Sequence, residues 1–258
     1  MSLTLKKGDD ACPIAIVKGG DDDGQKIYLS DKPVAESTSK LAKSSFERLT
    51  IDDGIFQQIP NTCKEREVGL IVGASGSGKS TYIRKYCQEY RKTFRNRPIF
   101  LISNLAEDES LAELKINRIK VDEDLVDEPL TLEDFGKDGC LVVFDDIDGM
   151  KKDIKKAVYD LLEVILFQGR HYNISAIVTS HMSNGPEMKK ILLEAHWFTY
   201  FPWGTTRSTI YVLEHYIGID PKQVHKVKAT KSRWATVFKN FPQAVLTEKN
   251  IFLLANEI

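Results

Sequence analysis

The sequence predicts an α/β fold, a mainly parallel β-sheet with helices on both faces. Short apolar runs of strand length alternate along the chain with longer stretches in which apolar residues recur every three or four positions. This alternation is typical of buried parallel strands joined by amphipathic helices. A glycine-rich turn links one central strand, residues 68–72, to the helical stretch that follows it. The 258 residues are enough for one large domain of this kind with small additions.

The glycine-rich turn has the pattern of a phosphate-binding loop (P-loop). Residues 73–80 read G-x-x-x-x-G-K-S, between a strand and a helix as the motif requires. Glycines allow successive backbone N–H groups to point inward around an anion, and the N-terminus of the next helix adds its own unpaired N–H groups. We expect Lys79 to contact the β- and γ-phosphates of ATP and the Ser80 hydroxyl to ligate Mg²⁺. The predicted nucleotide-binding residues are Gly73, Ala74, Ser75, Gly76, Ser77, Gly78, Lys79, Ser80 and Thr81.

Two adjacent carboxylates follow the apolar run at residues 141–144. Ligands of open α/β sheets bind at the carboxyl ends of the strands, so Asp145 and Asp146 are expected to face the nucleotide. Asp145 has the position that holds Mg²⁺, directly or through water, in P-loop enzymes. Asp146 is then available to orient and deprotonate an attacking water. An apolar run followed by acids is a weak signal alone, but it gains weight downstream of a P-loop.

The remaining elements divide the chain into three parts. Residues 1–65 are predicted to be an N-terminal extension, partly β and loop, with a hairpin formed by residues 14–17 and 27–29. Residues 66–203 form the predicted P-loop core, and residues 204–258 a C-terminal appendage of helix and hairpin packed on it. Within the core we expect helices at 83–94, near 108–115, at 158–168 and 186–195, and strands at 98–103, 118–121, 174–181 and 196–202.

Three motifs of the core occur in a distinctive order. They are Gly-Ala-Ser-Gly-Ser-Gly-Lys-Ser-Thr-Tyr-Ile, then Leu-Val-Val-Phe-Asp-Asp-Ile, then Gly-Arg-His-Tyr-Asn-Ile-Ser before a strand that ends in Thr-Ser-His. Over residues 66–217 the chain thereby resembles the poxvirus-type genome-packaging ATPases of large DNA viruses and virophages, members of the FtsK–HerA class. The resemblance implies an ATP-driven translocase of double-stranded DNA that fills a preformed capsid and works as a ring, a pentamer or hexamer. It also implies a sheet in which another strand separates the Asp145 strand from the P-loop strand.

The resemblance assigns roles to two further residues. Arg170 falls where this class has an arginine ahead of its fourth strand, which can serve a neighbouring subunit as an arginine finger. A surface arginine after a helix stop is the alternative. The class usually has a glutamine that senses the γ-phosphate at the end of this strand, whereas this chain has Ser180 and His181. His181 could donate a hydrogen bond to phosphate, and the choice between these two residues stays open.

The C-terminal appendage is predicted to be basic and of mixed α and β structure. A helix at 207–217 is followed by a second helix that opens at Asp220-Pro221 with a capping box, and by terminal strands. Basic residues interleaved with Trp234 and Phe238 could follow a DNA backbone, although a solvated helix face and a core strand are the alternative. Residues 221–240 contain no acid, and their basic residues are Lys222, Lys226, Lys228, Lys231, Arg233 and Lys239.

Composition restricts the setting in which the chain works. Its formal net charge is −1, so no global basic field draws it to nucleic acid or to an anionic membrane. Its four cysteines lack C-x-x-C spacing and are expected to be free thiols in a reducing compartment. No apolar run reaches the roughly 18 residues of a membrane span, and no signal peptide is visible. With the resemblance, this predicts a soluble protein at the virion or at a viral assembly site in the host cell.

Two other functions are compatible with the motifs. A P-loop kinase would transfer phosphate to a small acceptor, but the sequence shows no arginine-bearing lid of the kind that such kinases need. A nucleotide-switched assembly protein would bind ATP and assemble with slow turnover. An ATP-hydrolysing motor is the favoured interpretation because Asp146 adds a carboxylate that can activate water.

Overall fold

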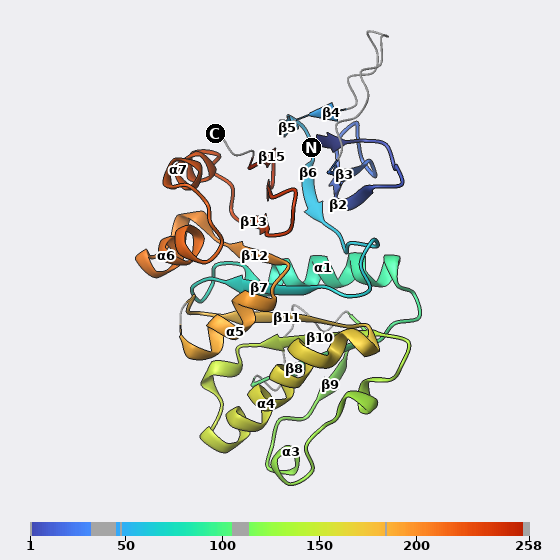
Figure 1. Cartoon of the computed structure of the whole chain (residues 1–258), viewed down its shortest axis with the longest axis vertical. Helices are drawn as coiled ribbons and strands as arrows, with labels where there is room; N and C mark the ends of the chain where they lie inside the picture. The colour runs from blue at the N-terminus through green and yellow to red at the C-terminus, as the bar shows by residue number, and fades with distance from the viewer. Residues whose placement is uncertain (1, 32–44, 47, 105–113, 184, 255–258) are drawn as a thin grey trace.

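The computed structural model describes residues 2–31, 45–46, 48–104, 114–183 and 185–254. Its centre is a ten-stranded sheet with the order β5-β15-β14-β13-β12-β7-β11-β10-β8-β9 (Figure 1). The six strands from β12 to β9 in this order are mutually parallel, and the other four are antiparallel to their neighbours. The parallel strands are β7 (Val68–Val72), β8 (Ile99–Ser103), β9 (Asn117–Ile119), β10 (Cys140–Asp145), β11 (Ile174–Ser180) and β12 (Trp197–Tyr200).

This order confirms the predicted fold. The sheet is mainly parallel, and β11 lies between the P-loop strand β7 and the aspartate strand β10, as the resemblance implied. The antiparallel extension consists of the C-terminal strands and one strand from the N-terminal part of the chain. These are β13 (Ala235–Phe238), β14 (Ala244–Thr247), β15 (Asn250–Leu253) and β5 (Arg48–Thr50).

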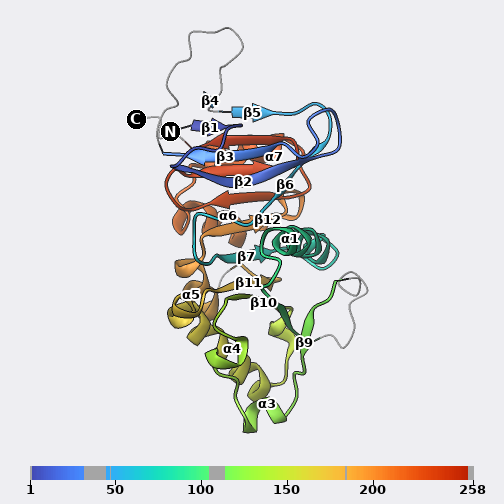
Figure 2. The same cartoon turned by 90° about the vertical axis from the view of Figure 1, so that its right-hand side faces the viewer.

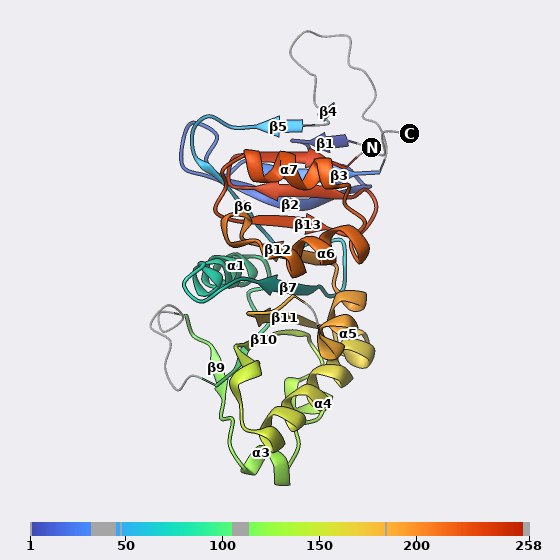
Figure 3. The same cartoon turned by 90° about the vertical axis from the view of Figure 1, so that its left-hand side faces the viewer.

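Helices cover both faces of the sheet because its central strands are buried on both sides. In β7, Val68 and Leu70 face one hydrophobic core, and Ile71 faces the other. One face is covered by α1 (Lys79–Thr93) together with a small β-sheet, as Figure 2 shows. The opposite face, seen in Figure 3, carries α4 (Lys152–Gln168), α5 (Pro186–Glu194), α6 (Arg207–His215) and α7 (Pro221–Ala229).

The N-terminal part contributes all five strands of a small antiparallel sheet. Its order is β4-β1-β3-β2-β6, and the predicted hairpin is confirmed by the pairing of β2 with β3. The intervening β5 instead pairs with β15 at the edge of the large sheet, with Thr50 opposite Asn250. The strands are β1 (Ser2–Thr4), β2 (Ala11–Lys18), β3 (Lys26–Ser30), β4 (Ser45–Phe46) and β6 (Ile55–Gln58). Both ends of the chain therefore contribute strands to the central sheet, while the boundaries at 65/66 and 203/204 stay predictions.

The shorter elements also follow from local sequence. At the start of α7 the Asp220 carboxylate accepts from Lys222 N at 2.7 Å, and Asp220 N donates to Gln223 Oε1 at 3.1 Å, which confirms the capping box. The helix expected near 108–115 falls largely outside the described residues. The remaining short helices are α3 (Asp124–Asp127) and four 3₁₀ turns, η1 (Leu132–Phe135), η2 (Ile147–Gly149), η3 (Gly169–Tyr172) and η4 (Pro202–Gly204).

Two expectations from composition can be compared with the structure. All four cysteines are free; Cys87 and Cys140 are buried, Cys12 is half-buried and Cys63 is exposed. Among the described helices, none has both the length and the apolar character that crossing a bilayer requires.

Candidate active site

The P-loop leaves β7 at the carboxyl edge of the parallel strands. Gly73 N donates to the carbonyl of Ser180 at 3.1 Å, so the loop begins against the end of β11. A Cβ atom on Gly73 would come within 2.5 Å of the Phe201 ring and of Ser77 Oγ. Gly78 has a φ of 107°, a backbone conformation that side chains disfavour, and α1 begins at the next residue. Glycine is thus required at both ends of the loop.

Lys79 is folded back onto this loop. Its side chain is buried, and Nζ donates to the carbonyl of Gly73 at 3.0 Å and to that of Ala74 at 3.4 Å. The ammonium also lies 3.3 Å from His181 Nδ1 and 3.9 Å from Asp146 Oδ1. The charge is therefore held at the loop mainly by neutral oxygens, which phosphate oxygens would outcompete electrostatically.

The two adjacent aspartates have different environments. Asp145 is 1% exposed and accepts a hydrogen bond from Thr179 Oγ1 at 2.6 Å. The same hydroxyl accepts from Asp146 N at 3.1 Å, so Thr179 holds both residues. Asp146 has a φ of 48°, in the left-handed region, and its side chain is 31% exposed. This backbone turn directs the second carboxylate toward His181, whose Nε2 lies 3.1 Å from Asp146 Oδ1.

At the end of β11, Ser180 and His181, the two candidates for sensing the γ-phosphate, have different contacts. The His181 ring lies near both the Lys79 ammonium and the Asp146 carboxylate. Ser180 is 1% exposed, and its hydroxyl donates instead to Asp148 Oδ2 at 2.8 Å. The structure thus brings His181, rather than the Ser180 hydroxyl, to the P-loop lysine.

Arg170 lies at the opposite edge of the sheet. It belongs to η3, immediately before β11, whereas the P-loop follows the carboxyl end of β7. The seven residues of β11 span roughly 23 Å, much more than the reach of an arginine side chain. Arg170 is 74% exposed, and its Nε lies 3.3 Å from Glu65 Oε2. The structure therefore does not bring Arg170 to the P-loop of its own chain.

The oxygen atoms at this edge are the kind that Mg²⁺ prefers. Ser80 supplies a hydroxyl at the start of α1, and Asp145 supplies a carboxylate across β11. Mg²⁺ is usually held by one or two such side chains together with water and substrate phosphates. In the described ranges no group of three or more His, Cys, Asp or Glu could hold a metal alone. The donor set thus fits a metal that is bound together with phosphate.

Several residues of the site carry no motif of their own. Thr179, Asp148 and Phe201 are placed here by strand pairing and by the turn after β10. The polar Thr-Ser-His exit of the strand was the only signal in the sequence for this part of the site.

The aromatic residues of the C-terminal segment do not face solvent. Trp234 and Phe238 are each 8% exposed, and the Trp234 ring packs edge-on against Tyr82 at 5.0 Å. The core-strand alternative is therefore correct for both rings, which cannot stack on nucleic-acid bases. Burial lowers the pKa of Lys239, whose ammonium donates to the Leu192 carbonyl. The lysines exposed on α7 are Lys222, Lys226 and Lys228.

Comparisons with known proteins agree with this architecture. Residues 69–173 match the family model described as an AAA domain of the dynein-related subfamily. The fold is shared with the genome-packaging NTPase B204 of Sulfolobus turreted icosahedral virus 2 in complex with AMPPCP, at a TM-score of 0.50, 15% identity, and coverage of 71% of this chain and 98% of that one. It is also shared with the cytoplasmic domain of the type VII secretion ATPase EccC of Thermomonospora curvata, at a TM-score of 0.52 and 13% identity. That match covers 96% of this chain and 29% of the EccC chain.

A closer relative occurs in a virophage. "Uncharacterized protein V3" of Sputnik virophage is 39% identical over 250 residues, which cover 95% of this chain and 96% of V3. The chain belongs to the same family as V3, and its P-loop NTPase fold and three ordered motifs agree with the resemblance to the packaging ATPases of the FtsK–HerA class.

Proposed function

We propose that this protein is a Mg²⁺-dependent ATPase motor that packages viral double-stranded DNA into a preformed capsid. The observation that carries the proposal is the meeting of Lys79, Asp146 and His181 at the P-loop, with Asp145 held beside them by Thr179. B204, whose fold the chain shares, is described as a genome-packaging NTPase. That description and the family membership support the packaging role.

Each residue has a defined part in the proposed hydrolysis. The loop amides and Lys79 bind the phosphates of ATP, and Ser80 and Asp145 hold the metal. When bound, Mg²⁺ would neutralise charge on the phosphate oxygens. Asp146 orients a water and accepts its proton while the water oxygen bonds to the γ-phosphorus and the bond to the β,γ-bridging oxygen breaks, releasing ADP and phosphate. His181 is placed to donate a hydrogen bond to a γ-phosphate oxygen.

Arg170 is proposed to act on a neighbouring subunit. It cannot reach the P-loop of its own chain, and its exposed pair with Glu65 is of a kind worth at most about 1 kcal/mol. An arginine supplied by the adjacent copy would stabilise charge on the transferring phosphoryl group and tie hydrolysis to ring assembly. An arginine that acts between subunits requires a homo-oligomer, and we propose a ring, a pentamer or hexamer, that works with a capsid or portal-vertex component at the virion or assembly site.

DNA contact is proposed through phosphates rather than through bases. The lysines exposed on α7 can neutralise backbone phosphates, whereas Trp234 and Phe238 are buried in the core. Contacts of this kind carry no sequence preference and weaken as salt rises. This suits a motor that must move any sequence through its ring.

Phosphate release with and without linear duplex DNA, at matched salt, tests the proposal on protein whose mass in solution has been measured. A motor releases phosphate faster with DNA, and protein without Lys79 does not respond. Transfer of labelled phosphate to an organic acceptor would indicate a kinase instead. ATP binding with assembly but almost no phosphate release would indicate a nucleotide switch.

A further inference from the structure

Ser180, the last residue of β11, is fixed from three directions. Its carbonyl accepts from Gly73 N in the P-loop at 3.1 Å. Its hydroxyl accepts from Met182 N at 3.1 Å and donates to Asp148 Oδ2 at 2.8 Å. The backbone on both sides of His181 is thereby anchored through one serine, and the anchor ends on the Asp148 carboxylate.

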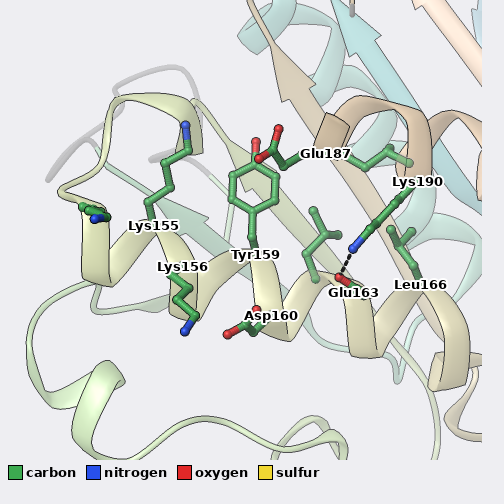
Figure 4. Close-up of a pocket in the computed structure, with 11 residues that line it drawn as sticks. Lys155, Lys156, Tyr159, Asp160, Glu163, Leu166, Glu187 and Lys190 are labelled. Carbon is green, nitrogen blue, oxygen red and sulfur yellow. Dashed lines mark hydrogen bonds and ion pairs between the residues drawn. The ribbon is translucent and has the colours of Figure 1, made fainter. Parts of the chain in front are cut away.

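Asp148 is in turn held by α4. Tyr159 OH donates to Asp148 Oδ1 at 2.8 Å, and Lys155 Nζ lies 3.8 Å from the same oxygen and donates to the Asp148 carbonyl at 3.3 Å. Burial and the bond to Asp148 raise the pKa of Tyr159, so its hydroxyl stays a donor. Lys155 and Tyr159 lie on α4 and line a groove of about 310 Å³ between α4 and α5 (Figure 4). Asp148 thus connects the start of α4 to the end of β11.

His181 depends on this connection for its orientation. Its side chain is 42% exposed, and its described contacts are with Lys79 and Asp146, both of which would change partners when a triphosphate binds. Packing alone therefore does not hold the ring in one orientation. The charge-assisted bond from Ser180 to Asp148 fixes the hydroxyl that anchors Met182 N, on the far side of His181.

We propose that Asp148 is a positioning residue for His181, acting through Ser180 and stabilised by Tyr159 and Lys155 from α4. The inference rests on the proposed function, because His181 matters only if the P-loop edge hydrolyses a nucleotide. Asp148 touches neither phosphate nor water in this role. Asp148 determines the position of the His181 imidazole when the γ-phosphate is present. Loss of the Asp148 carboxylate should therefore lower turnover without lowering nucleotide affinity.

The experiment uses the variants Asp148→Asn and Ser180→Ala in the full chain. Nucleotide affinity and KM should stay within about twofold of wild type, and kcat should fall about tenfold, because only a transition-state interaction is lost. The His181 imidazole is followed by NMR among the five histidines, with its signal assigned from a His181→Gln variant. In both variants this signal should shift and broaden.

Two further variants serve as controls. Ser180→Thr keeps the hydroxyl and should retain wild-type turnover. Glu163 Oε2 lies 2.5 Å from Lys190 Nζ in the same groove (Figure 4). Glu163→Gln removes the negative charge of this ion pair and leaves the contacts of Asp148 intact. It should leave both kcat and the His181 signal unchanged. The thermal unfolding midpoint of each variant establishes that the fold is intact.

Three results would overturn the proposal. The first is an unchanged kcat in Asp148→Asn together with an unchanged His181 signal. The second is a loss of nucleotide affinity as large as the loss of turnover, which would make the network a support of the P-loop alone. The third is a folded Asp148→Asn protein in which only the Tyr159 environment changes. If the wild-type protein hydrolyses no nucleotide, the proposed function fails, while the His181 signal still decides whether Asp148 positions this ring.

Discussion

The two edges of the parallel sheet have opposite characters. At the carboxyl edge, Lys79, Asp145, Asp146, Thr179 and His181 are joined by contacts of 2.6 to 3.9 Å, and three of the five are buried. These contacts hold the buried groups Lys79, Asp145 and Thr179 in place before any ligand arrives. Such preorganisation is what hydrolytic chemistry requires, since oriented groups need no rearrangement in the transition state.

The amino edge combines structural polar groups with the exposed Arg170. Arg66 donates to the carbonyls of Ile165 and Leu166 at 2.6 Å each and so completes the C-terminal end of α4. Arg170 has a single exposed ion pair with Glu65 and is otherwise in solvent. An arginine held so loosely contributes little to the stability of its own subunit, and it can change partners when another copy approaches.

The difference between the edges suggests that, in the proposed oligomer, one subunit binds the nucleotide and its neighbour supplies Arg170. Within one chain, the carboxyl edge has the phosphate lysine and the two carboxylates, and Arg170 is a strand length away. For Arg170 to act as proposed, the amino edge of one copy would have to meet the carboxyl edge of the next. The predictions below change one edge at a time and begin with the largest expected effect.

Lys79→Ala should abolish nucleotide binding and turnover. Burying the triphosphate without this ammonium leaves its charge uncompensated, and we expect a loss of more than about 100-fold. Calorimetric ATP binding and phosphate release measure it. Lys85→Ala, on the same helix but outside the loop, is the matched control and should bind ATP normally. Normal ATPase activity in Lys79→Ala would remove the P-loop from the mechanism.

Arg170→Ala should preserve ATP binding but reduce turnover by about 10³-fold, the range known for arginine fingers. Mixing it with Asp146→Ala protein should restore some activity, because mixed interfaces then pair an intact carboxyl edge with an intact amino edge. Glu65→Ala removes only the partner of Arg170 and should leave turnover unchanged. A mixture that stays inactive would count against action between subunits.

The sequence was informative about the carboxyl edge where a local pattern determines the structure. The P-loop could be predicted because its glycines and its Lys-Ser pair are adjacent in the chain, and the strand and helix around them have strong periodicity. Asp145 and Asp146 could be predicted for the same reason, as the end of an apolar run. Arg170 came from the family resemblance, and its role in a neighbour stays a prediction.

Contacts that depend on strand register could not be predicted. Thr179 reaches Asp145 because Phe144 pairs with Val178 in the parallel register of β10 and β11, which no local pattern specifies. The pairing of β5 with β15 joins residues about 200 positions apart. Both depend on the global arrangement of strands, since periodicity determines which side chains are buried but leaves their neighbours undetermined.

Thr179→Val tests whether the buried threonine organises the carboxyl edge. It removes the Thr179 hydroxyl that donates to the Asp145 carboxylate and accepts from Asp146 N, so we expect turnover to fall about tenfold and the free energy of unfolding to fall by about 1–3 kcal/mol. The Mg²⁺ concentration for half-maximal activity should rise. Thr199→Val is the control, because Thr199 is equally buried but bonds Thr236 at 2.7 Å, away from the aspartates. It should reduce stability without altering the Mg²⁺ dependence.

The smallest expected effect is a pH dependence of stability that arises from His196 at the amino edge and is absent at neutral pH. Burial, followed by the charges of Lys64, Arg66 and Lys239, lowers the pKa of His196 from 6.5 to about 4. Its Nδ1 accepts from Val68 N at 2.8 Å, so the neutral ring has its proton on Nε2. The unfolded chain takes up this proton as pH falls below about 6.5, whereas the folded protein resists it until about 4.

The free energy of unfolding should therefore decrease as the pH falls from about 6.5 to about 4. The decrease should be about 2 kcal/mol, because the ring is partly exposed to solvent, and it should level off below about pH 4. His196→Asn keeps an acceptor for Val68 N but cannot titrate, so its unfolding free energy should lack this component. Denaturant unfolding at a series of pH values measures the difference between the two proteins. Because Glu67 is present in both proteins, this difference cancels its contribution, which acts in the opposite direction since burial raises the pKa of its carboxyl. Parallel profiles for both proteins would show that the pKa of His196 is the same in the folded and unfolded states, which would contradict the lowered pKa.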